Sequence, residues 1–533
     1  MIKLHQTSYI AGDWVSPDGA EFQSKNPVTG ETLQTYRSCG PAETEAAMAA
    51  AHASFAEYRR CDKDQIVKFL NTVADEIEAL GDQLLETADA ETGLGLVRLT
   101  GERGRTCGQI RAFAAIVDEG HWVQASIDTA LPDRSPLPKP DLRRVMIPIG
   151  PVVVFGASNF PFAFGSVGGD TASALAAGNP VVVKGHPSHP ATSELFAHAM
   201  DRAINRTGMP SGLFSLLQGC TNELGGDLVR HEMTQAVGFT GSLAGGRALM
   251  DIAAARPRPI PVYAEMGSIN PVFIAEDALA SRGEEIAAGL VASVTMGTGQ
   301  FCTSPGVVVT TANTEFEQAF ATGLSEAARG VLLNEKIGQS LQAAITAVTS
   351  RDDVEWLNPV DISEIEVLTP PNCVLKTTAA SFLADQALQE EIFGPVSLIV
   401  ECDCPAEMRK VAAGLEGNLT ATVHATKKDR EQLAELVELL EGSVGRVIYN
   451  GFPTGVEVCP SQQHGGPYPA SSASATTSVG ADAMVRFARF VAYQDMPDEL
   501  LPPALQNSNP YQLLRRLDGV FSDSAISPDT EGA

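Results

Sequence analysis

The stretch Val152-Val153-Val154-Phe155-Gly156-Ala157-Ser158-Asn159-Phe160-Pro161 decides the fold, because a continuous apolar run stops abruptly at a turn of small residues. Similar apolar runs begin near positions 181, 214 and 235, and Ala-rich helical segments separate them, one of them at about 190–205. Strands that are apolar on both faces and alternate with helices are typical of a parallel sheet covered on both sides. Residues 144–273 are therefore predicted to form a doubly wound α/β domain.

The regions on either side of this domain have patterns of their own. Two long helical patterns, at about 41–56 and 63–92, lie in the first 125 residues, and a Pro-rich segment follows at 128–140. A second α/β region runs from about 268 to 470 and is followed by a strand-like stretch at 484–493. The tail from about 521 is rich in Ser, Asp and Pro, and we expect it to be disordered.

The composition excludes several classes of protein. The chain has 533 residues and a net charge of −28, which argues against nucleic acid and against anionic membranes as partners. No apolar run approaches the roughly 20 residues that span a bilayer, and no secretory signal begins the sequence, so we expect a cytoplasmic protein. Nine cysteines without framework spacing predict no disulfide scaffold. Neither Cys402 with Cys404 nor His186 with His189 has further ligands nearby, so no metal is expected.

Two segments have features of a cofactor or oxyanion site. Asn159 follows a predicted strand, where ligands gather in open α/β sheets, and its amide could donate to an oxyanion. Residues 238–246, Gly-Phe-Thr-Gly-Ser-Leu-Ala-Gly-Gly, would let backbone N–H groups approach a pyrophosphate at a helix N-terminus. Arg247 follows where a P-loop requires Lys. Taken singly, a helix-capping Asn and an ordinary glycine turn explain these segments equally well.

Two further segments offer a base and a nucleophile. Glu265 lies at another predicted strand end beside a glycine turn and could act as a general base, although a surface loop Glu is the simpler interpretation. Cys302 lies among small residues in Gly297-Thr298-Gly299-Gln300-Phe301-Cys302-Thr303-Ser304-Pro305, where a thiol can be exposed and activated. An inert structural cysteine is the alternative.

In this order and at these distances, the four segments resemble the aldehyde dehydrogenase superfamily. The family pattern consists of an Asn-Phe-Pro segment, a Phe-Thr-Gly-Ser turn, a Glu-x-Gly segment and a Gly-Gln-x-Cys loop. A fifth match, at 390–396, is similar to the family's Glu-x-Phe-Gly-Pro clamp on the cofactor. The resemblance covers about residues 8–500. It implies a Rossmann-type cofactor domain of residues 1–127 and 148–267, a catalytic domain of 268–479, and oligomerisation strands at 128–147 and 480–500.

The resemblance also implies a mechanism. Cys302 would attack an aldehyde, with the oxyanion held by Asn159 and the Cys302 N–H group, and Glu265 would activate the water that hydrolyses the thioester. Glu265 could also take the thiol proton. The presence of Glu265 favours hydrolysis over a CoA-acylating or phosphorylating relative, and the complete set disfavours a non-enzymatic binding protein. A homodimer or homotetramer is expected.

The resemblance assigns seven residues to a nicotinamide dinucleotide, namely Lys184, Ser188, Gly241, Ser242, Gly246, Glu391 and Phe393. NAD-specific members place a carboxylate three residues after the lysine, where Pro187 stands here. Because an acid there would repel a 2′-phosphate, its absence favours NADP, with NAD remaining possible. Ser188 and His189 could add polar contacts to the nucleotide.

Two departures from the common pattern bear on the substrate. Thr303-Ser304-Pro305-Gly306 follows the cysteine, and His464-Gly465-Gly466 replaces the usual Phe-Gly-Gly. These features resemble the group that oxidises 2,5-dioxopentanoate (α-ketoglutaric semialdehyde) to 2-oxoglutarate, with an NADP-dependent fatty aldehyde dehydrogenase as the alternative.

The carboxylate of a semialdehyde requires a cation or several donors in the pocket. The resemblance suggests Arg103, Thr303, Phe162 and Phe452 as substrate residues. Arg105, Arg111, Thr106 and Gln109 lie nearby, but helical spacing cannot direct all three arginines into one pocket.

Overall fold

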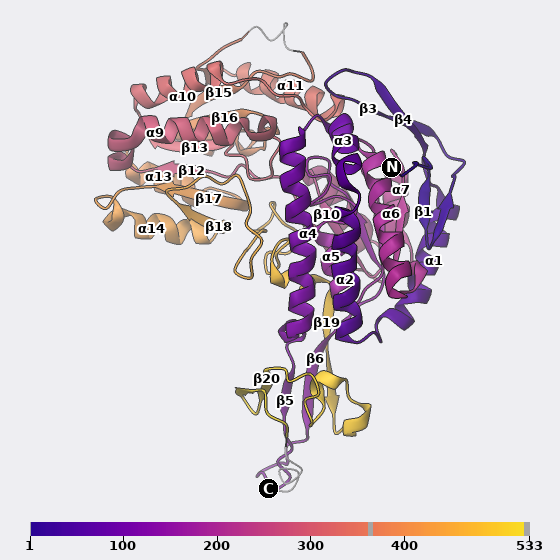
Figure 1. The fold of residues 1–533 in the computed structure, drawn as a ribbon. Helices are drawn as coiled ribbons and strands as arrows, with labels where there is room; N and C mark the ends of the chain where they lie inside the picture. The colour runs from indigo at the N-terminus through magenta and orange to yellow at the C-terminus, as the bar shows by residue number, and fades with distance from the viewer. Residues whose placement is uncertain (1, 361–365, 527–533) are drawn as a thin grey trace.

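The computed structural model describes residues 2–360 and 366–526 and divides into three parts (Figure 1). Two α/β parts lie side by side, and a small sheet projects below them and carries the C-terminal end of the chain. No described helix is long and apolar enough to cross a membrane.

The first part contains a seven-stranded sheet in the order β11-β10-β7-β8-β9-β1-β2. The five strands from β11 to β9 are parallel, and β1 and β2 add to the β9 side in antiparallel fashion. This confirms the parallel sheet predicted for residues 144–273. The strands are β1 Ser8–Ile10, β2 Asp13–Val15, β7 Val152–Phe155, β8 Val181–Lys184, β9 Phe214–Leu217, β10 Ala236–Thr240 and β11 Val262–Glu265. A separate hairpin pairs β3 Glu21–Lys25 with β4 Thr32–Arg37.

Helices cover both faces of this sheet because successive residues of a strand point to opposite sides. Val152 and Val154 pack into the core formed with α2 to α6, whereas Val153 packs into the core formed with α1 and α7. The helices are α1 Pro41–Tyr58, α2 Lys63–Glu78, α3 Gly81–Thr92, α4 Leu96–Glu119, α5 Gly169–Ala176, α6 Pro190–Thr207, α7 Asn222–Arg230 and α8 Leu243–Ala254.

The helical pattern predicted at 63–92 is two helices, not one. The chain breaks between α2 and α3 at Gly81, whose φ of 61° lies in the left-handed region that favours glycine. The apolar spacing continues across the break, so periodicity alone did not reveal it.

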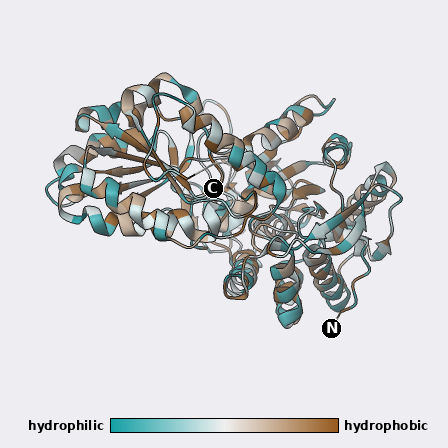
Figure 2. Ribbon diagram, turned by 90° about the horizontal axis from the view of Figure 1, so that it is seen from above, coloured by the Kyte–Doolittle hydropathy of each residue, from teal (hydrophilic) through white to brown (hydrophobic). Residues whose placement is uncertain are grey.

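The second part is another seven-stranded sheet, in the order β14-β15-β16-β13-β12-β17-β18. Here too the faces alternate: Val308 packs against α9 and α10, whereas Val307 and Val309 pack into the opposite core. In Figure 2 the strands are brown between helices that are largely teal on their outer sides. The strands are β12 Val272–Ile274, β13 Val307–Thr311, β14 Glu355–Trp356, β15 Cys373–Thr378, β16 Val396–Cys402, β17 Asn418–His424 and β18 Val444–Tyr449. The helices are α9 Glu276–Thr295, α10 Thr314–Glu326, α11 Glu335–Thr349, α12 Ala379–Ala384, α13 Pro405–Ala413 and α14 Arg430–Glu441.

The projecting part is a five-stranded sheet in the order β19-β6-β5-β20-β21. The strands are β5 Ser126–Asp128, β6 Leu142–Pro148, β19 Ala488–Gln494, β20 Arg515–Leu517 and β21 Val520–Ser522. The strand-like stretch at 484–493 was placed too early, because 481–487 form a 3-10 helix.

The prediction of a disordered tail from 521 is wrong for its first residues. Phe521 and Ser522 belong to β21, and the N–H of Ile526 donates to the carbonyl of Asn507 at 2.8 Å. Residues 527–533 lie outside the described residues.

Candidate active site

The predicted site residues share one edge of the first sheet. Strands β11, β10, β7 and β8 are parallel neighbours, so their carboxyl ends meet at the same edge. Glu265 ends β11, Gly241 follows β10, Asn159 follows β7 by four residues, and Lys184 ends β8. The topology therefore brings together four residues that are far apart in the sequence.

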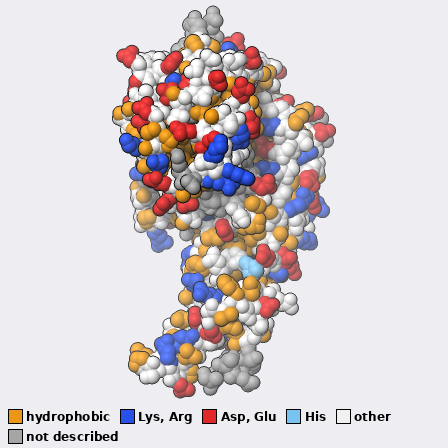
Figure 3. Space-filling view, turned by 90° about the vertical axis from the view of Figure 1, so that its left-hand side faces the viewer, with side chains coloured by type: hydrophobic (Ala, Val, Ile, Leu, Met, Phe, Trp, Pro, Cys, Tyr) orange, Lys and Arg blue, Asp and Glu red, His pale blue; other side chains and the backbone are white. Residues whose placement is uncertain are grey.

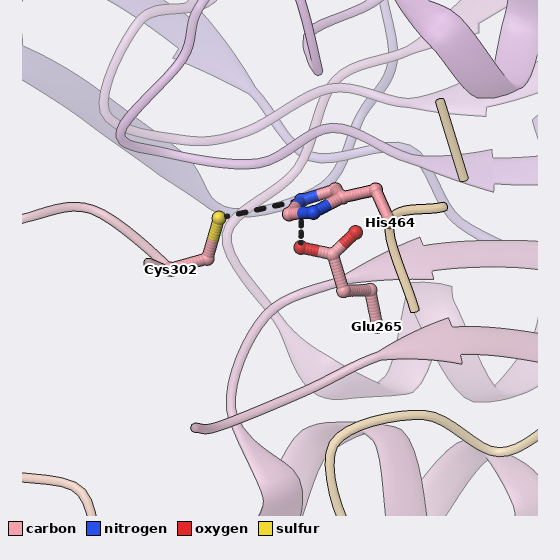
Figure 4. Close-up of side chains that lie close together, drawn as sticks. All are labelled: Glu265, Cys302 and His464. Carbon is pink, nitrogen blue, oxygen red and sulfur yellow. Dashed lines mark hydrogen bonds and ion pairs between the residues drawn. The ribbon is translucent and has the colours of Figure 1, made fainter. Parts of the chain in front are cut away.

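Cys302, His464 and Glu265 form a compact cluster at this edge (Figure 4). Sγ of Cys302 lies 3.6 Å from Nε2 of His464, and the same nitrogen lies 3.0 Å from Oε1 of Glu265. The Cys302 sulfur, one ring nitrogen of His464 and one carboxylate oxygen of Glu265 all lie within 4.8 Å of one another. His464 and Glu265 are 1% and 4% exposed. A thiol, an imidazole and a carboxylate in this arrangement can exchange protons.

His464 is the site residue that the sequence interpretation missed. The segment His464-Gly465-Gly466 departs from the family pattern, but the sequence interpretation assigns no role to His464. The available signal was a histidine in place of an aromatic apolar residue beside two glycines, since a buried imidazole needs polar partners.

The electrostatics of the cluster oppose the thiolate. Burial, together with the Glu265 carboxylate, raises the pKa of Cys302 well above its ordinary value. Burial alone would raise the pKa of Glu265 as well, but His464, Ser478 and Cys302 together hold it below its ordinary value. The thiol is therefore the protonated partner and Glu265 the ionised one at neutral pH.

Asn270 holds the loop that carries Cys302. Its amide Nδ2 donates to the carbonyls of Cys302 at 2.8 Å and Ser304 at 2.9 Å. Its Oδ1 accepts from the hydroxyls of Ser268 and Thr420, so both ends of the side chain are fixed. Asn270 is 0% exposed. A buried amide with all these partners makes the loop rigid.

Asn159 lies next to this loop, as an oxyanion donor must. Its Nδ2 donates to the carbonyl of Gln300 at 2.9 Å. The backbone carbonyl of Asn159 accepts a hydrogen bond from Arg98 at 2.6 Å. The Arg98 guanidinium lies 5.0 Å from the ring of Phe160 and 4.9 Å from that of Phe301. The Asn159 amide is thus oriented toward the loop of Cys302.

The glycine-rich turn begins a helix, as a pyrophosphate site requires. Ser242 is the N-cap of α8, and its Oγ accepts from the N–H of Gly245 at 3.2 Å. A Cβ at Gly246 would lie 2.5 Å from the sulfur of Met266, so this position demands glycine for packing. The N–H groups of Gly241 and Gly246 donate to the carbonyls of Glu265 and Ser242, whereas those of Leu243 and Ala244 have no hydrogen-bond partner among the described residues and could donate to a phosphate at the start of this 12-residue helix.

Lys184 and Glu391 are the polar side chains that could contact the rest of a dinucleotide. Burial lowers the pKa of Lys184 to about 8. Burial raises the pKa of Glu391 to about 8, and a Cβ on Gly267 would lie 2.8 Å from its Oε2. Glu391 and Phe393 line a cavity with Gly299 and Phe301 of the nucleophile loop.

The loop after β8 only partly fits the prediction. Ser188 is half-buried, and its hydroxyl accepts from Asn334 Nδ2 at 3.1 Å. His189, expected to add a polar contact to the nucleotide, is instead 0% exposed, and its Nε2 pairs with the carbonyl of Ala157 at 2.9 Å. It supports the structure of the loop.

The arginines of α4 point in different directions. Arg103 donates to the carbonyl of Gly81, and Arg111 forms ion pairs with Asp75 and Glu78 at the surface. Arg105 lies 5.4 Å from the ring of Phe164, whose ring centroid is 6.3 Å from that of His464. Its Nη1 is buried and has no hydrogen-bond partner among the described residues. Arg105, and not Arg103, is therefore the arginine of α4 that is a candidate for a contact with the substrate.

Two of the other proposed substrate residues pack against the cores of the two large parts. Phe162 is 0% exposed and packs edge-on against Phe196 at 5.3 Å. Phe452 is partly buried; it packs over Gly289 of α9 and lies 5.1 Å from His424, against the core of the second part. Within the described residues, no ring contact joins either side chain to His464 of the cysteine cluster.

Thr303, by contrast, is 1% exposed, and its hydroxyl has no partner among the described residues. On α4, Thr106 donates its hydroxyl back to the carbonyl of Glu102, whereas Nε2 of the buried Gln109 has no hydrogen-bond partner among the described residues. Thr303 remains a candidate for a polar contact with the substrate.

Arg446 on β18 is a second cation near the site. Burial lowers the pKa of both Arg446 and Arg105, and the nearby Cys302 opposes that shift in each case. Two of its guanidinium nitrogens donate to the carbonyls of Pro453 and Gly455, and its Nε is buried without a described partner.

Comparisons with known proteins agree with this geometry. The sequence model described as the aldehyde dehydrogenase family matches residues 14–478. Alpha-ketoglutaric semialdehyde dehydrogenase 2 of Azospirillum brasilense is 47% identical over 515 residues, which are 96% of this chain and 98% of that protein. Alpha-ketoglutaric semialdehyde dehydrogenase of Acinetobacter baylyi is 44% identical over 521 residues, 97% and 98% of the two chains. The solved structure of a 1-pyrroline-5-carboxylate dehydrogenase from Thermus with bound NAD shares the fold, with a TM-score of 0.77, 23% identity and 92% of each chain covered.

Proposed function

The chain belongs to the aldehyde dehydrogenase family, and we propose that it oxidises 2,5-dioxopentanoate to 2-oxoglutarate with NADP as the preferred hydride acceptor. The proposal depends on the 47% and 44% identity, over nearly the full length of the chain, to two enzymes named for this semialdehyde. The fatty aldehyde alternative is not favoured by these relatives.

A half-buried cation near the site supports an anionic substrate. Arg105 has a buried Nη1 without a hydrogen-bond partner among the described residues, and it lies next to Phe164, which contacts His464 of the cysteine cluster. A carboxylate would satisfy that buried N–H group in a charge-assisted hydrogen bond. A fatty aldehyde would leave it unpaired, at a cost of about 1–3 kcal/mol.

In the proposed mechanism, Cys302 is the nucleophile. Its sulfur forms a bond to the aldehyde carbon, and the carbonyl electron pair moves onto oxygen. The Asn159 amide and the Cys302 N–H group stabilise that oxyanion. After the carbon is oxidised, Glu265 accepts a proton from the water that attacks the thioester, and Cys302 leaves as the thiolate.

The residues present fit a nicotinamide dinucleotide. When bound, it accepts the hydride from the substrate carbon. Ser242 and the turn around Gly241 and Gly246 would hold the pyrophosphate, Lys184 and Ser188 the adenosine ribose, and Glu391 with Phe393 the nicotinamide side. The family uses both forms of the cofactor, and Pro187 supports NADP because it leaves no carboxylate beside a 2′-phosphate.

Steady-state kinetics on the purified protein test the proposal. We expect kcat/KM for 2,5-dioxopentanoate to exceed that for hexanal by at least about 10-fold, with succinic semialdehyde between them, and NADP to be used better than NAD. Cys302→Ala should have only background activity. A preference for hexanal would contradict the substrate, and full activity of Cys302→Ala would contradict the mechanism.

A further inference from the structure

His464 places one ring nitrogen between the two reactive groups of the site. Nε2 lies 3.6 Å from Sγ of Cys302 and 3.0 Å from Oε1 of Glu265, and Figure 4 shows the ring beside both groups. The histidine and the glutamate are both buried, so they interact with each other rather than with bulk water. The contact with sulfur is a hydrogen bond, along which a proton can move.

The surrounding backbone holds the ring in this position. The N–H of His464 donates to Oγ1 of Thr477 at 2.8 Å, and its carbonyl accepts from the N–H of Ser478 at 2.8 Å. The Ser478 hydroxyl also contacts Oε2 of Glu265, which links the histidine and the carboxylate. Nδ1 has no hydrogen-bond partner among the described residues, so no such bond determines the tautomer and Nε2 can be the acceptor.

The thiol requires a proton acceptor because its surroundings oppose ionisation. Two carboxylates, Glu265 and Glu391, and two guanidinium groups, Arg105 and Arg446, act on Cys302 electrostatically. Burial and Glu265 dominate, so the sulfur is protonated at neutral pH and weakly nucleophilic. An imidazolium next to the sulfur would offset the carboxylate and stabilise the thiolate.

We propose that His464 accepts the thiol proton of Cys302 at Nε2, which leaves Glu265 ionised for the hydrolytic step. The S–H bond breaks as the N–H bond forms, and the thiolate bonds to the aldehyde carbon while the imidazolium stays beside the Glu265 carboxylate. When the thioester is hydrolysed, the attacking water gives its proton to Glu265, the S–C bond breaks, and the sulfur recovers its proton from Nε2. The carboxylic acid product and the protonated Glu265 then each release one proton to solvent, so His464 and Glu265 both end the cycle as they began.

This inference rests on the proposed role of Cys302 as nucleophile but not on the identity of the aldehyde. Alkylation of Cys302 by iodoacetamide therefore tests it without substrate or cofactor. The rate is measured from about pH 5 to pH 10 on the full-length protein, with the labelled Cys302 peptide quantified by mass spectrometry. Cys302→Ser identifies any signal from the other cysteines.

We expect His464→Phe and His464→Gln to lower the alkylation rate at pH 7 at least about 10-fold, the effect of one pKa unit, and to approach the wild-type rate at high pH. Glu265→Gln should alkylate at least as fast as the wild type while losing turnover, because it removes the carboxylate that opposes the thiolate. The glutamine variant keeps a polar side chain and replaces the phenylalanine variant if that one does not fold, as judged by its melting temperature.

A wild-type pH profile in both His464 variants would overturn the proposal. So would a loss of reactivity at pH 7 in Glu265→Gln alone, because Glu265 would then be the acceptor. If the wild-type protein alkylates as expected but oxidises no semialdehyde, the proposed substrate fails and the role of His464 stands.

Discussion

Two arginines on α4, two positions apart, have opposite surroundings. Arg103 donates to the carbonyl of Gly81 between helices, whereas Arg105 is directed toward Phe164, and its Nη1 has no hydrogen-bond partner among the described residues. Neighbours two apart on a helix point about 200° apart, so only one of them can face the site. This difference provides a matched pair for testing which side chain binds the substrate carboxylate.

Arg105→Met should raise KM for 2,5-dioxopentanoate by about 10- to 100-fold, because it removes a charge-assisted hydrogen bond of about 1.5–3 kcal/mol. The activity with hexanal should fall much less, since that substrate has no carboxylate and loses only the effect of the guanidinium charge on Cys302. Arg103→Met is the control and should leave both substrates within about threefold of the wild type. Equal losses in the two variants would remove Arg105 from the substrate site. Initial rates with each aldehyde at saturating cofactor measure the effect.

At the scale of elements, the loop that carries Cys302 depends on one side chain from another segment. Asn270, with φ of 43°, donates to the carbonyls of both Cys302 and Ser304. Asn tolerates this left-handed conformation better than most residues. The amide therefore sets both the path of its own chain and the position of the nucleophile.

Asn270→Asp should lower kcat by about 10- to 100-fold and stability by about 1–3 kcal/mol, because the carboxylate cannot donate to either carbonyl. The shape of the side chain is retained, so the change isolates the two hydrogen bonds. Urea unfolding gives the stability and steady-state rates give kcat. Asn334→Asp is the comparison: it removes only the donor to Ser188 and should affect kcat far less. Wild-type kcat in Asn270→Asp would show that the loop keeps its position without these bonds.

The loop between β8 and α6 is the element that we expect to select the cofactor. Pro187→Glu places a carboxylate three residues after Lys184, near the expected 2′-phosphate. Repulsion should lower kcat/KM for NADP at least about 10-fold relative to NAD. Pro187→Gln has the same length without the charge and serves as the control. If both variants change the NADP/NAD ratio equally, loss of the proline and not the charge is responsible.

The sequence predicts elements well where local pattern and packing agree. The valine runs at 152–154 and 181–183 are buried on both faces, and their strands are found where predicted. The positions of Asn159 and Glu265 after parallel strands also predict that these two residues meet, because the carboxyl ends of such strands lie at one edge of the sheet. Cys302 reaches them from the loop before β13 of the second sheet, which the strands of the first sheet do not predict. The predictions that failed concern where a side chain points in the folded protein, which local sequence does not determine. Phe162 and His189 are buried in the core, and Arg103 points away from the site. His464 joins the site only through a loop that returns from the distant C-terminal region, which no local pattern indicates.

At the scale of the whole molecule, the site needs segments from both large parts. Glu265 and Asn159 come from the first sheet, whereas Cys302 lies on the loop before β13 of the second sheet. Ser471 forms an isolated bridge with Glu265, which ties the segment that follows His464 to β11. The arrangement is thus fixed by tertiary contacts and not by one element, and mutations between the parts should affect catalysis before they affect the fold.

The projecting sheet is too exposed to suit an isolated chain, and we expect it to mediate a homodimer or homotetramer. Its edge strand β19 leaves one row of backbone groups unpaired within the described chain, and Phe490 on that strand is 40% exposed. Val520 and Phe521 at the other edge are 68% and 70% exposed. Figure 3 shows hydrophobic side chains distributed along this projecting part. Such surfaces are normally covered by another subunit.

Sedimentation velocity should therefore give two or four times the chain mass of 56.1 kDa at micromolar concentration. Phe490→Asp should shift the equilibrium toward the monomer, because it places a charge on an apolar edge strand. Val28→Asp is the matched control. Val28 is 62% exposed and lies in the turn between β3 and β4, a hairpin that Figure 1 shows far from the projecting sheet, so this variant should leave the assembly unchanged. A monomeric wild type, or equal dissociation in both variants, would contradict a role for β19 in assembly. Since Cys302, His464 and Glu265 all come from one chain, the dissociated variant should still alkylate at Cys302, which separates assembly from the chemistry of the site.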